Sequence, residues 1–133
     1  MKTATSHFWV GHFKTEEAFF DFFAENEEFY DNEDDSDDSY LSEFSKSQGE
    51  NWYDHDFFES GFENETVTLK EKFSGYSYSN EWLPVIEQKI SALNIDFNIN
   101  TIAFIDKEEI GRPVSVKTTD FELVYIGEIE YRI

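Results

Sequence analysis

The stretch that decides the fold is His7-Phe8-Trp9-Val10-Gly11-His12-Phe13, and it is followed at once by Thr15-Glu16-Glu17. The aromatic and β-branched residues of the first segment predict a strand. Thr15 predicts a helix cap, and the two glutamates lie where the positive end of a helix dipole favours carboxylates. Phe19, Phe22 and Phe23 then recur at i, i+3 and i+4, which places them on one helical face.

Further helical patterns follow along the chain. Residues 41–47 predict a short amphipathic helix, and residues 66–73 are compatible with a helix or a strand. From Ser79 to Asn94 apolar side chains recur with helical spacing, and Ser79 is the expected N-cap. Phe20 lies off the apolar face of the first helix, so we expect it to meet a second surface.

Two strand patterns lie in the last third of the sequence. Residues 98–106 predict a buried strand, residues 107–118 a loop, and residues 121–131 an alternating strand. The segment between these strands holds too little helix for a parallel crossover, so we expect the two strands to pair antiparallel. Together the elements predict a single α+β domain over residues 1–133, with a mainly antiparallel sheet, helices packed on one face, and an acidic loop at about 25–40.

Negative charge is concentrated in the first half of the chain. The sequence contains 30 acidic and 10 basic residues, a formal net charge of −20. Residues 1–66 hold 19 acidic and 3 basic side chains, against 11 and 7 in residues 67–133. Such an excess repels itself in a compact domain, and a strongly basic partner would account for it. Nucleic acids and anionic membranes carry the same sign, so direct binding to either is disfavoured.

Aromatic residues make up 19% of the chain, too many for a solvated, disordered tail in spite of the charge. The sequence has no cysteine, which excludes a disulfide framework and a thiolate metal site. It shows neither a signal-peptide pattern nor an apolar run of about 20 residues. These features favour a cytoplasmic protein.

The densest charge lies between Glu25 and Asp38, a run with nine carboxylates and no basic residue. Like charges at this density resist regular structure, so we expect an exposed loop. A solvated loop is the plainest interpretation, and the sharper one is an electrostatic contact surface for a basic protein, with the aromatic and acidic residues 52–56 nearby. The partner-binding residues predicted in this way are Glu27, Glu28, Asp31, Glu33, Asp34, Asp35, Asp37, Asp38, Trp52, Asp54, His55 and Asp56.

A calcium loop is an alternative for the same run. An EF-hand alignment that starts at Asn32 places Asp34, Ser36 and Asp38 at oxygen-donor positions and a glutamate at the twelfth. Asp37 then occupies the sixth position, where the sharp turn requires glycine. The sequence therefore predicts no metal site here.

The segment most suggestive of an active site is Trp52-Tyr53-Asp54-His55-Asp56. Flanking carboxylates would favour the charged form of the histidine, which suits acid–base chemistry. However, neighbours in sequence do not share a face, and the chain has no Gly-x-Ser-x-Gly nucleophile motif. A metal site would need His7, His12 and His55 to converge from three segments. We predict no catalytic residue, metal or cofactor, and keep a hydrolase centred on His55 as an alternative.

Several of these segments together resemble the immunity protein 22 family of bacterial polymorphic toxin systems. The similarity covers nearly the whole chain, including residues 8–13 with the Thr-Glu-Glu helix, the acidic stretch, and residues 41–47, 75–79 and 125–131. Its most specific part is Trp52 through Phe57. The resemblance implies a small α+β protein, not an enzyme, that protects a bacterium from a toxin made by itself or its kin.

The charge pattern and the resemblance converge on one function. The resemblance implies a cognate toxin, many such toxins are nucleases, and a carboxylate-rich face suits their basic active-site surfaces. We predict a non-enzymatic inhibitor that binds its toxin through an acidic, aromatic surface. An acidic nucleic-acid mimic that regulates a host DNA-binding protein requires the same electrostatics and stays open as an alternative. The sequence leaves open the identity of the toxin and the oligomeric state.

Overall fold

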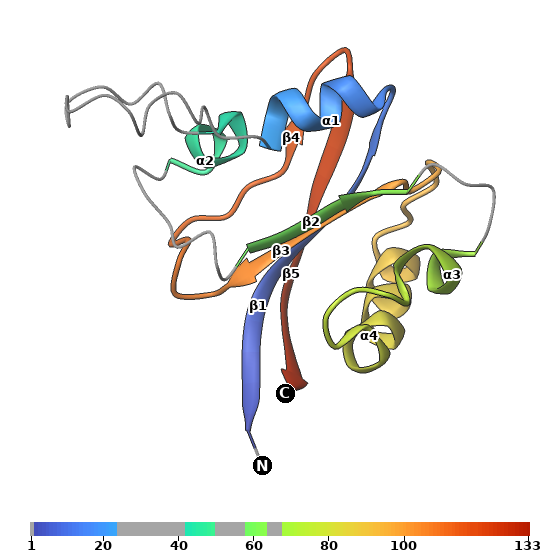
Figure 1. Cartoon of the computed structure of the whole chain (residues 1–133), viewed down its shortest axis with the longest axis vertical. Helices are drawn as coiled ribbons and strands as arrows, with labels where there is room; N and C mark the ends of the chain where they lie inside the picture. The colour runs from blue at the N-terminus through green and yellow to red at the C-terminus, as the bar shows by residue number, and fades with distance from the viewer. Residues whose placement is uncertain (1, 24–41, 50–57, 64–67) are drawn as a thin grey trace.

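The sheet is built around β1 (Thr3–Phe13), whose two edges are both paired. The computed structural model describes residues 2–23, 42–49, 58–63 and 68–133 (Figure 1). The elements that follow β1 along the chain are α1 (Glu16–Phe23), α2 (Glu43–Ser47), β2 (Phe58–Phe62), α3 (Leu69–Phe73), α4 (Ser79–Ala92), β3 (Thr101–Asp106), β4 (Val116–Lys117) and β5 (Phe121–Arg132).

Five strands form one antiparallel sheet in the order β2-β3-β1-β5-β4. The predicted α+β class with a mainly antiparallel sheet is therefore confirmed. The predicted pairing of the last two long strands is wrong, because β1 lies between β3 and β5 and pairs antiparallel with each. Residues 107–120 run back over one face of β1, where His7 and Trp9 hydrogen-bond to the carbonyls of Ile110 and Val114, so β3 and β5 run in the same direction without sharing an edge.

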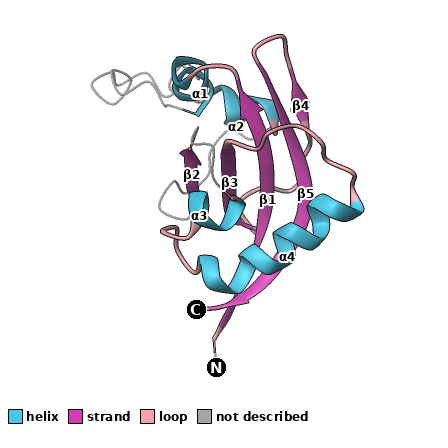
Figure 2. Ribbon diagram, turned by 90° about the vertical axis from the view of Figure 1, so that its right-hand side faces the viewer, coloured by secondary structure: helices cyan, strands magenta, loops and turns pink. Residues whose placement is uncertain are grey.

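Helices cover both faces of this sheet. Alternate residues of β1 point to opposite faces. Phe8 and Val10 join a core cluster with Trp82 of α4, whereas Trp9 and Phe13 join a second cluster with the phenylalanines of α1 and α2. Figures 1 and 2 show α1 and α2 on one side of the sheet and α3 and α4 on the other. The expectation of helices on one face is corrected, because the middle of β1 is apolar on both faces and needs cover on each.

A β-bulge changes the phase of β5. The register between β1 and β5 shifts between Phe8 and Trp9, where β5 contains one additional residue, Ile126. Gly127 follows with a φ of 105°, a backbone conformation that favours glycine. Leu123 before the bulge belongs to the cluster beneath α1, whereas Ile129 after it, which an unbroken alternation would place on the same face, belongs to the cluster beneath α4. The single alternation predicted for this strand is therefore split into two phases.

The start and the apolar face of α1 are as predicted. The Oγ1 of Thr15 accepts a hydrogen bond from the backbone N–H of Ala18 at 3.0 Å. The buried side chains of this helix are Phe19, Phe22 and Phe23. Phe20 is 54% exposed, and within the described residues its ring has one aromatic neighbour, Phe19, with the ring centroids 5.4 Å apart. The second surface expected for Phe20 is therefore not supplied by this part of the chain.

The remaining helices begin at side-chain or backbone caps. Ser42 and Thr68 each accept a hydrogen bond from the backbone N–H three residues ahead, so the ambiguous segment after Thr68 is a helix. The α4 helix is capped one residue earlier than predicted, because its N-cap is Tyr78, with a φ of 58°. Ser79 is the first helical residue, and its hydroxyl donates to the carbonyl of Ser74 at 2.7 Å.

Candidate functional site

All twelve predicted partner-binding residues, from Glu27 to Asp38 and from Trp52 to Asp56, lie outside the described residues, and so does the predicted acidic loop. The structure instead describes the residues that border these two stretches, which are Phe23, Ser42, Gly49 and Phe58. The candidate site is therefore built from its described borders and from the surface beside them.

A cluster of aromatic rings joins these borders, and we call Trp9, Phe23, Phe44 and Phe58 the Phe44 cluster. The ring centroid of Phe44 lies 5.2 Å from that of Phe23 and 5.3 Å from that of Phe58. Phe23 and Phe58 are 5.9 Å apart, and Trp9 meets Phe44 edge-on at 5.0 Å. Phe44 is 0% exposed. The borders of both acidic stretches are therefore fixed at one place in the core.

The end of α2 is also fixed, because it binds the loop between β3 and β4. The buried side chain of Gln48 accepts a hydrogen bond from the backbone N–H of Val114 at 2.6 Å and donates to its carbonyl at 3.1 Å. The indole N–H of Trp9 donates to the same carbonyl at 2.9 Å. A helix of five residues has little stability of its own, so these contacts determine its orientation.

His7 is a buried structural residue on the same face. Its Nε2 lies 2.9 Å from the carbonyl oxygen of Ile110, which can only accept, so Nε2 carries the hydrogen. In the neutral ring Nδ1 then accepts from the hydroxyl of Tyr125, at 2.8 Å. Burial raises the pKa of Tyr125, which keeps that donor protonated. His7 thus holds the residue 107–115 loop against the sheet.

His12 lies on the opposite face of β1 from His7. The two are five residues apart in one strand, about 16 Å at the usual rise per residue, so they cannot bind one metal ion. Among the residues that the structure describes, no three His, Asp or Glu side chains are grouped in a way that could hold a metal.

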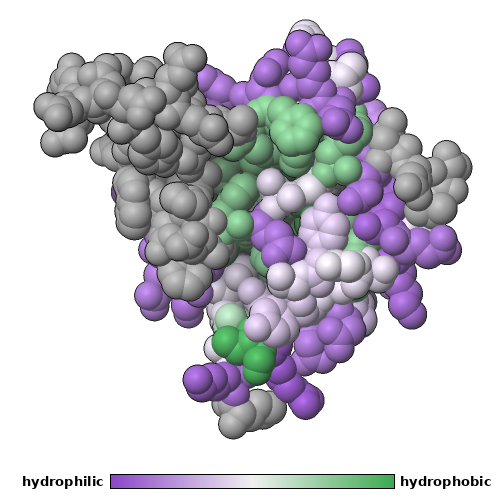
Figure 3. Space-filling model, viewed as in Figure 1, coloured by the Kyte–Doolittle hydropathy of each residue, from purple (hydrophilic) through white to green (hydrophobic). Residues whose placement is uncertain are grey.

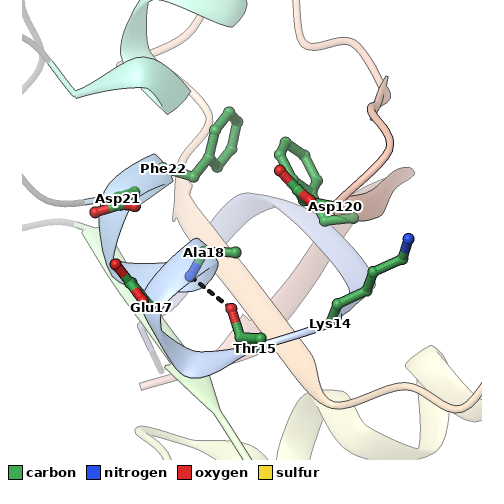
Figure 4. Close-up of a pocket in the computed structure, with 8 residues that line it drawn as sticks. Lys14, Thr15, Glu17, Ala18, Asp21, Phe22 and Asp120 are labelled. Atoms are coloured by element: carbon green, nitrogen blue, oxygen red, sulfur yellow. Dashed lines mark hydrogen bonds between the residues drawn. The ribbon is translucent and has the colours of Figure 1, made fainter.

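A groove of about 440 Å³ lies between α1 and the start of β5. Phe22 and Phe121, with ring centroids 4.6 Å apart, form its apolar floor. Figure 4 shows Glu17 and Asp21 on α1 at one side of the groove and Asp120 at the other. Such a groove suits a lysine or arginine side chain, whose aliphatic stem packs on apolar surface while its charged head meets carboxylates. Its lining residues are Lys14, Thr15, Glu17, Ala18, Asp21, Phe22, Asp120 and Phe121.

Sequence reasoning did not find this groove. Asp21 and Asp120 are far apart in the chain, and the antiparallel register that places Phe13 opposite Phe121 brings them together. The backbone N–H of Lys14 donates to the carbonyl of Asp120 at 3.0 Å and closes that end of the groove. No local pattern in the sequence predicts a site of this kind, because its two walls come from segments far apart in the chain.

The outer side of α1 combines an exposed aromatic ring with carboxylates. Phe20 is 54% exposed, and Glu16, Glu17 and Asp21 around it on the helix are exposed as well. Figure 3 shows hydrophobic residues gathered over α1 and the strand region beside it, with hydrophilic residues along the margin of that face. An aromatic centre with an acidic rim is the composition of a protein-binding surface that selects a basic partner.

Comparison with known proteins identifies the family of this chain. A family model, described as immunity protein 22, matches residues 7–132. The searches of curated proteins and of solved structures found no match. None of the described helices has the length and hydropathy of a membrane span. Since the family model covers almost all of the sequence, the chain belongs to the immunity protein 22 family, and as an immunity protein it neutralises a toxin by binding rather than by catalysis.

Proposed function

We propose that this immunity protein neutralises a nuclease toxin by docking an acidic, aromatic surface onto the toxin's basic surface. Two segments contribute to this surface, Glu25–Asp38 with its nine carboxylates and Trp52–Asp56. The observation that carries the proposal is the Phe44 cluster. Its rings hold Phe23, Phe44 and Phe58, which lie at or near the described borders of the two segments, with centroids 5.2 to 5.9 Å apart, and this supports a surface to which both segments contribute.

Electrostatics favour this pairing over other partners. A nuclease active site attracts phosphates, and a face rich in carboxylates is attracted by the same field. A net charge of −20 accelerates encounter with such a surface over distances comparable to the Debye length, about 8–10 Å at moderate salt. The proposed encounter takes place in the cytoplasm, where a nuclease toxin meets nucleic acid.

The described surface next to these segments supports the same partner chemistry. The groove beside α1 presents Glu17, Asp21 and Asp120 around an apolar floor, which suits a basic side chain of the toxin. Phe20 supplies an exposed aromatic ring of the kind that anchors interfaces. A standard interface buries about 800 Å² on each partner, which is enough to include α1 together with both acidic segments.

The first test is co-expression with the toxin domain encoded immediately upstream. Growth rescue and a stable one-to-one complex are expected. Neither rescue nor a complex with a demonstrably active toxin domain would overturn the proposed function.

The second test maps the surface. Reversal of Asp34, Asp35, Asp37 and Asp38 to lysine should slow association several-fold and flatten its salt dependence. A matched control reverses four exposed carboxylates outside both segments, namely Glu87 and Asp96 on the α4 side and Glu128 and Glu130 at the end of β5 far from α1, and changes the net charge by the same amount. If both variants associate at the same rate with the same salt slope, the acidic run is not the docking surface.

A further inference from the structure

A cavity of about 280 Å³ on the other side of the same sheet end differs from the acidic groove in that two lysines line it. It lies where β1 ends, β5 begins and β4 pairs with β5 (Figure 1). Two aromatic side chains, Phe97 and Phe121, contribute apolar surface to it. We call it the cationic notch, and its lining residues are His12, Lys14, Phe97, Lys117, Thr118, Thr119, Phe121 and Glu122.

The notch gathers positive charge on a strongly acidic chain. Two of the chain's ten basic residues, Lys14 and Lys117, line it together with His12. Among the described residues Glu122 is the one carboxylate in the lining. With histidine counted as neutral, these side chains sum to +1 on a protein whose net charge is −20. An anionic group should therefore meet less repulsion at the notch than at the acidic groove.

The groups of the notch that can bind an anion are its two lysine ammonium groups. His12 donates from Nδ1 to the carbonyl of Asn98 at 2.7 Å, so in the neutral ring its Nε2 is an acceptor and adds no donor for an anion. Lys14 makes no ion pair with any described residue. Lys117 pairs with Glu122 at 3.4 Å, but its side chain is 76% exposed, and a pair this exposed contributes little. Neither lysine side chain is buried in the core.

We propose that the cationic notch binds an aspartate or glutamate side chain of the toxin and thereby fixes the orientation of the docked complex. This inference rests on the proposed function and extends it. The notch and the acidic groove share Lys14 and Phe121, so a partner that covers the groove reaches the notch as well. Attraction between the acidic surface and the toxin is nearly independent of orientation. A positive site next to that surface lowers the binding free energy of one docked orientation relative to the others.

Whether charge reversal in the notch raises or lowers the affinity for the toxin tests this proposal. The double variant Lys14→Glu/Lys117→Glu changes the net charge from −20 to −24. Long-range steering alone predicts faster association with a basic toxin and an unchanged dissociation rate. Binding of a toxin carboxylate in the notch predicts the opposite outcome for affinity, a Kd raised at least tenfold through faster dissociation.

The matched control is Lys2→Glu/Lys107→Glu. Both lysines are exposed, and the hydrogen bonds from Ile133 N–H to the carbonyl of Lys2 and from Lys107 N–H to the carbonyl of Thr5 place them at the far end of the sheet. This variant has the same net charge, so it isolates the effect of steering. Binding is measured by surface plasmon resonance against the toxin domain encoded upstream, after thermal melts have shown that each variant is folded.

Each outcome decides the question. A tenfold loss for the notch variant, with no loss for the control, supports the proposal. A neutral variant, Lys14→Gln/Lys117→Gln, should lie between wild type and the reversed variant and serves if the reversed variant does not fold. Equal affinities for the notch variant and the control overturn the inference and leave the proposed function standing. Absence of any wild-type complex overturns both.

Discussion

Truncation of Phe44 should remove the contact that joins the borders of the two acidic segments. Phe44 is 0% exposed, and its ring lies between 5.0 and 5.9 Å from those of Trp9, Phe22, Phe23 and Phe58. The change Phe44→Ala deletes these four ring contacts and leaves a cavity between α2 and the sheet. Because α2 has only five residues, it cannot move as a unit to fill that cavity without losing the bonds from Gln48.

The expected loss of unfolding free energy is large. A buried phenylalanine truncated to alanine costs about 3–5 kcal/mol, and each aromatic pair adds about 0.5–1.5 kcal/mol beyond area burial. These contributions are not additive, so we place the loss at about 4–5 kcal/mol. The unfolding free energy of a domain of this size is about 5–15 kcal/mol, so the variant should be only marginally stable. Phe44→Leu, which keeps part of the side-chain volume, should lose less and remain folded.

Urea unfolding monitored by tryptophan fluorescence measures this loss, since Trp9 is in direct contact with Phe44. With a slope of about 2 kcal/mol/M, the midpoint should fall by about 2 M. Phe20→Ala is the stability control, because Phe20 is 54% exposed and should change the unfolding free energy by less than about 0.5 kcal/mol. A loss below about 1.5 kcal/mol for Phe44→Ala, or a loss equal to that of the control, would refute the assignment of Phe44 as the centre of this cluster.

Three further predictions follow from single contacts. A Cβ at Gly61 would overlap the hydroxyl of Tyr76, so Gly61→Ala should lower the unfolding free energy by about 1–3 kcal/mol in thermal melts, whereas Gly75→Ala, with open space around it, should not. Gln48→Met should cost about 1–2 kcal/mol in urea unfolding and accelerate hydrogen exchange at Val114, whose backbone N–H would lose its acceptor while its carbonyl keeps the bond from Trp9. Burial and the nearby Glu63 raise the pKa of Tyr76. Between pH 10 and that raised value the unfolded chain ionises first, so stability should fall as pH rises above 10, and less steeply in Tyr76→Phe; parallel pH curves for the two proteins would contradict this.

Elements with a strong apolar period were predictable from the sequence. The apolar face of α1 and the first half of that of α4 are buried as expected, with Trp82 and Ile86 both 0% exposed, whereas Leu93, at the end of the predicted pattern, is 52% exposed because α4 ends at Ala92. The ends of these helices were less predictable, because α4 begins after Tyr78 in a left-handed conformation that nothing in the local sequence requires. Periodicity reports which residues face the core, whereas caps depend on one or two residues.

Strand pairing was not predictable in the same way. The two long C-terminal strands have the pattern of neighbours, yet β1 separates them. The residues Val116 and Lys117 form β4 opposite Leu123 and Glu122, and two residues are too few to show any period. Which edges meet is decided by long-range packing, and a single sequence records this only indirectly.

The packing of helices on both faces of the sheet was nevertheless predictable from the sequence. Phe8, Trp9 and Val10 are consecutive and are all 0% exposed. A run of apolar residues without alternation is typical of a strand buried on both faces, whereas a strand with one solvent face alternates. The charge pattern likewise indicated a binding surface, but not the groove or the notch, because both are assembled from the end of β1 and the start of β5.

Most charged side chains of the described residues lie outside the core, so the acidic run should be replaceable without loss of stability. Both core clusters consist of apolar and aromatic side chains, and the ion pairs of the described residues lie at the surface, as in Glu43–Lys46 at 3.7 Å; Lys72 is buried and donates to the carbonyl of Ile99 at 2.7 Å. Carboxylates crowded in one run repel one another, so reversing Asp34, Asp35 and Asp37 to lysine should leave Tm unchanged or raise it while slowing association with the toxin. A fall in Tm of more than about 5 °C would show that the run supports the fold, since a shift of that size corresponds to roughly 1–2 kcal/mol. The loss of binding could then no longer be assigned to charge alone, and the docking surface would have to be mapped with neutral substitutions instead.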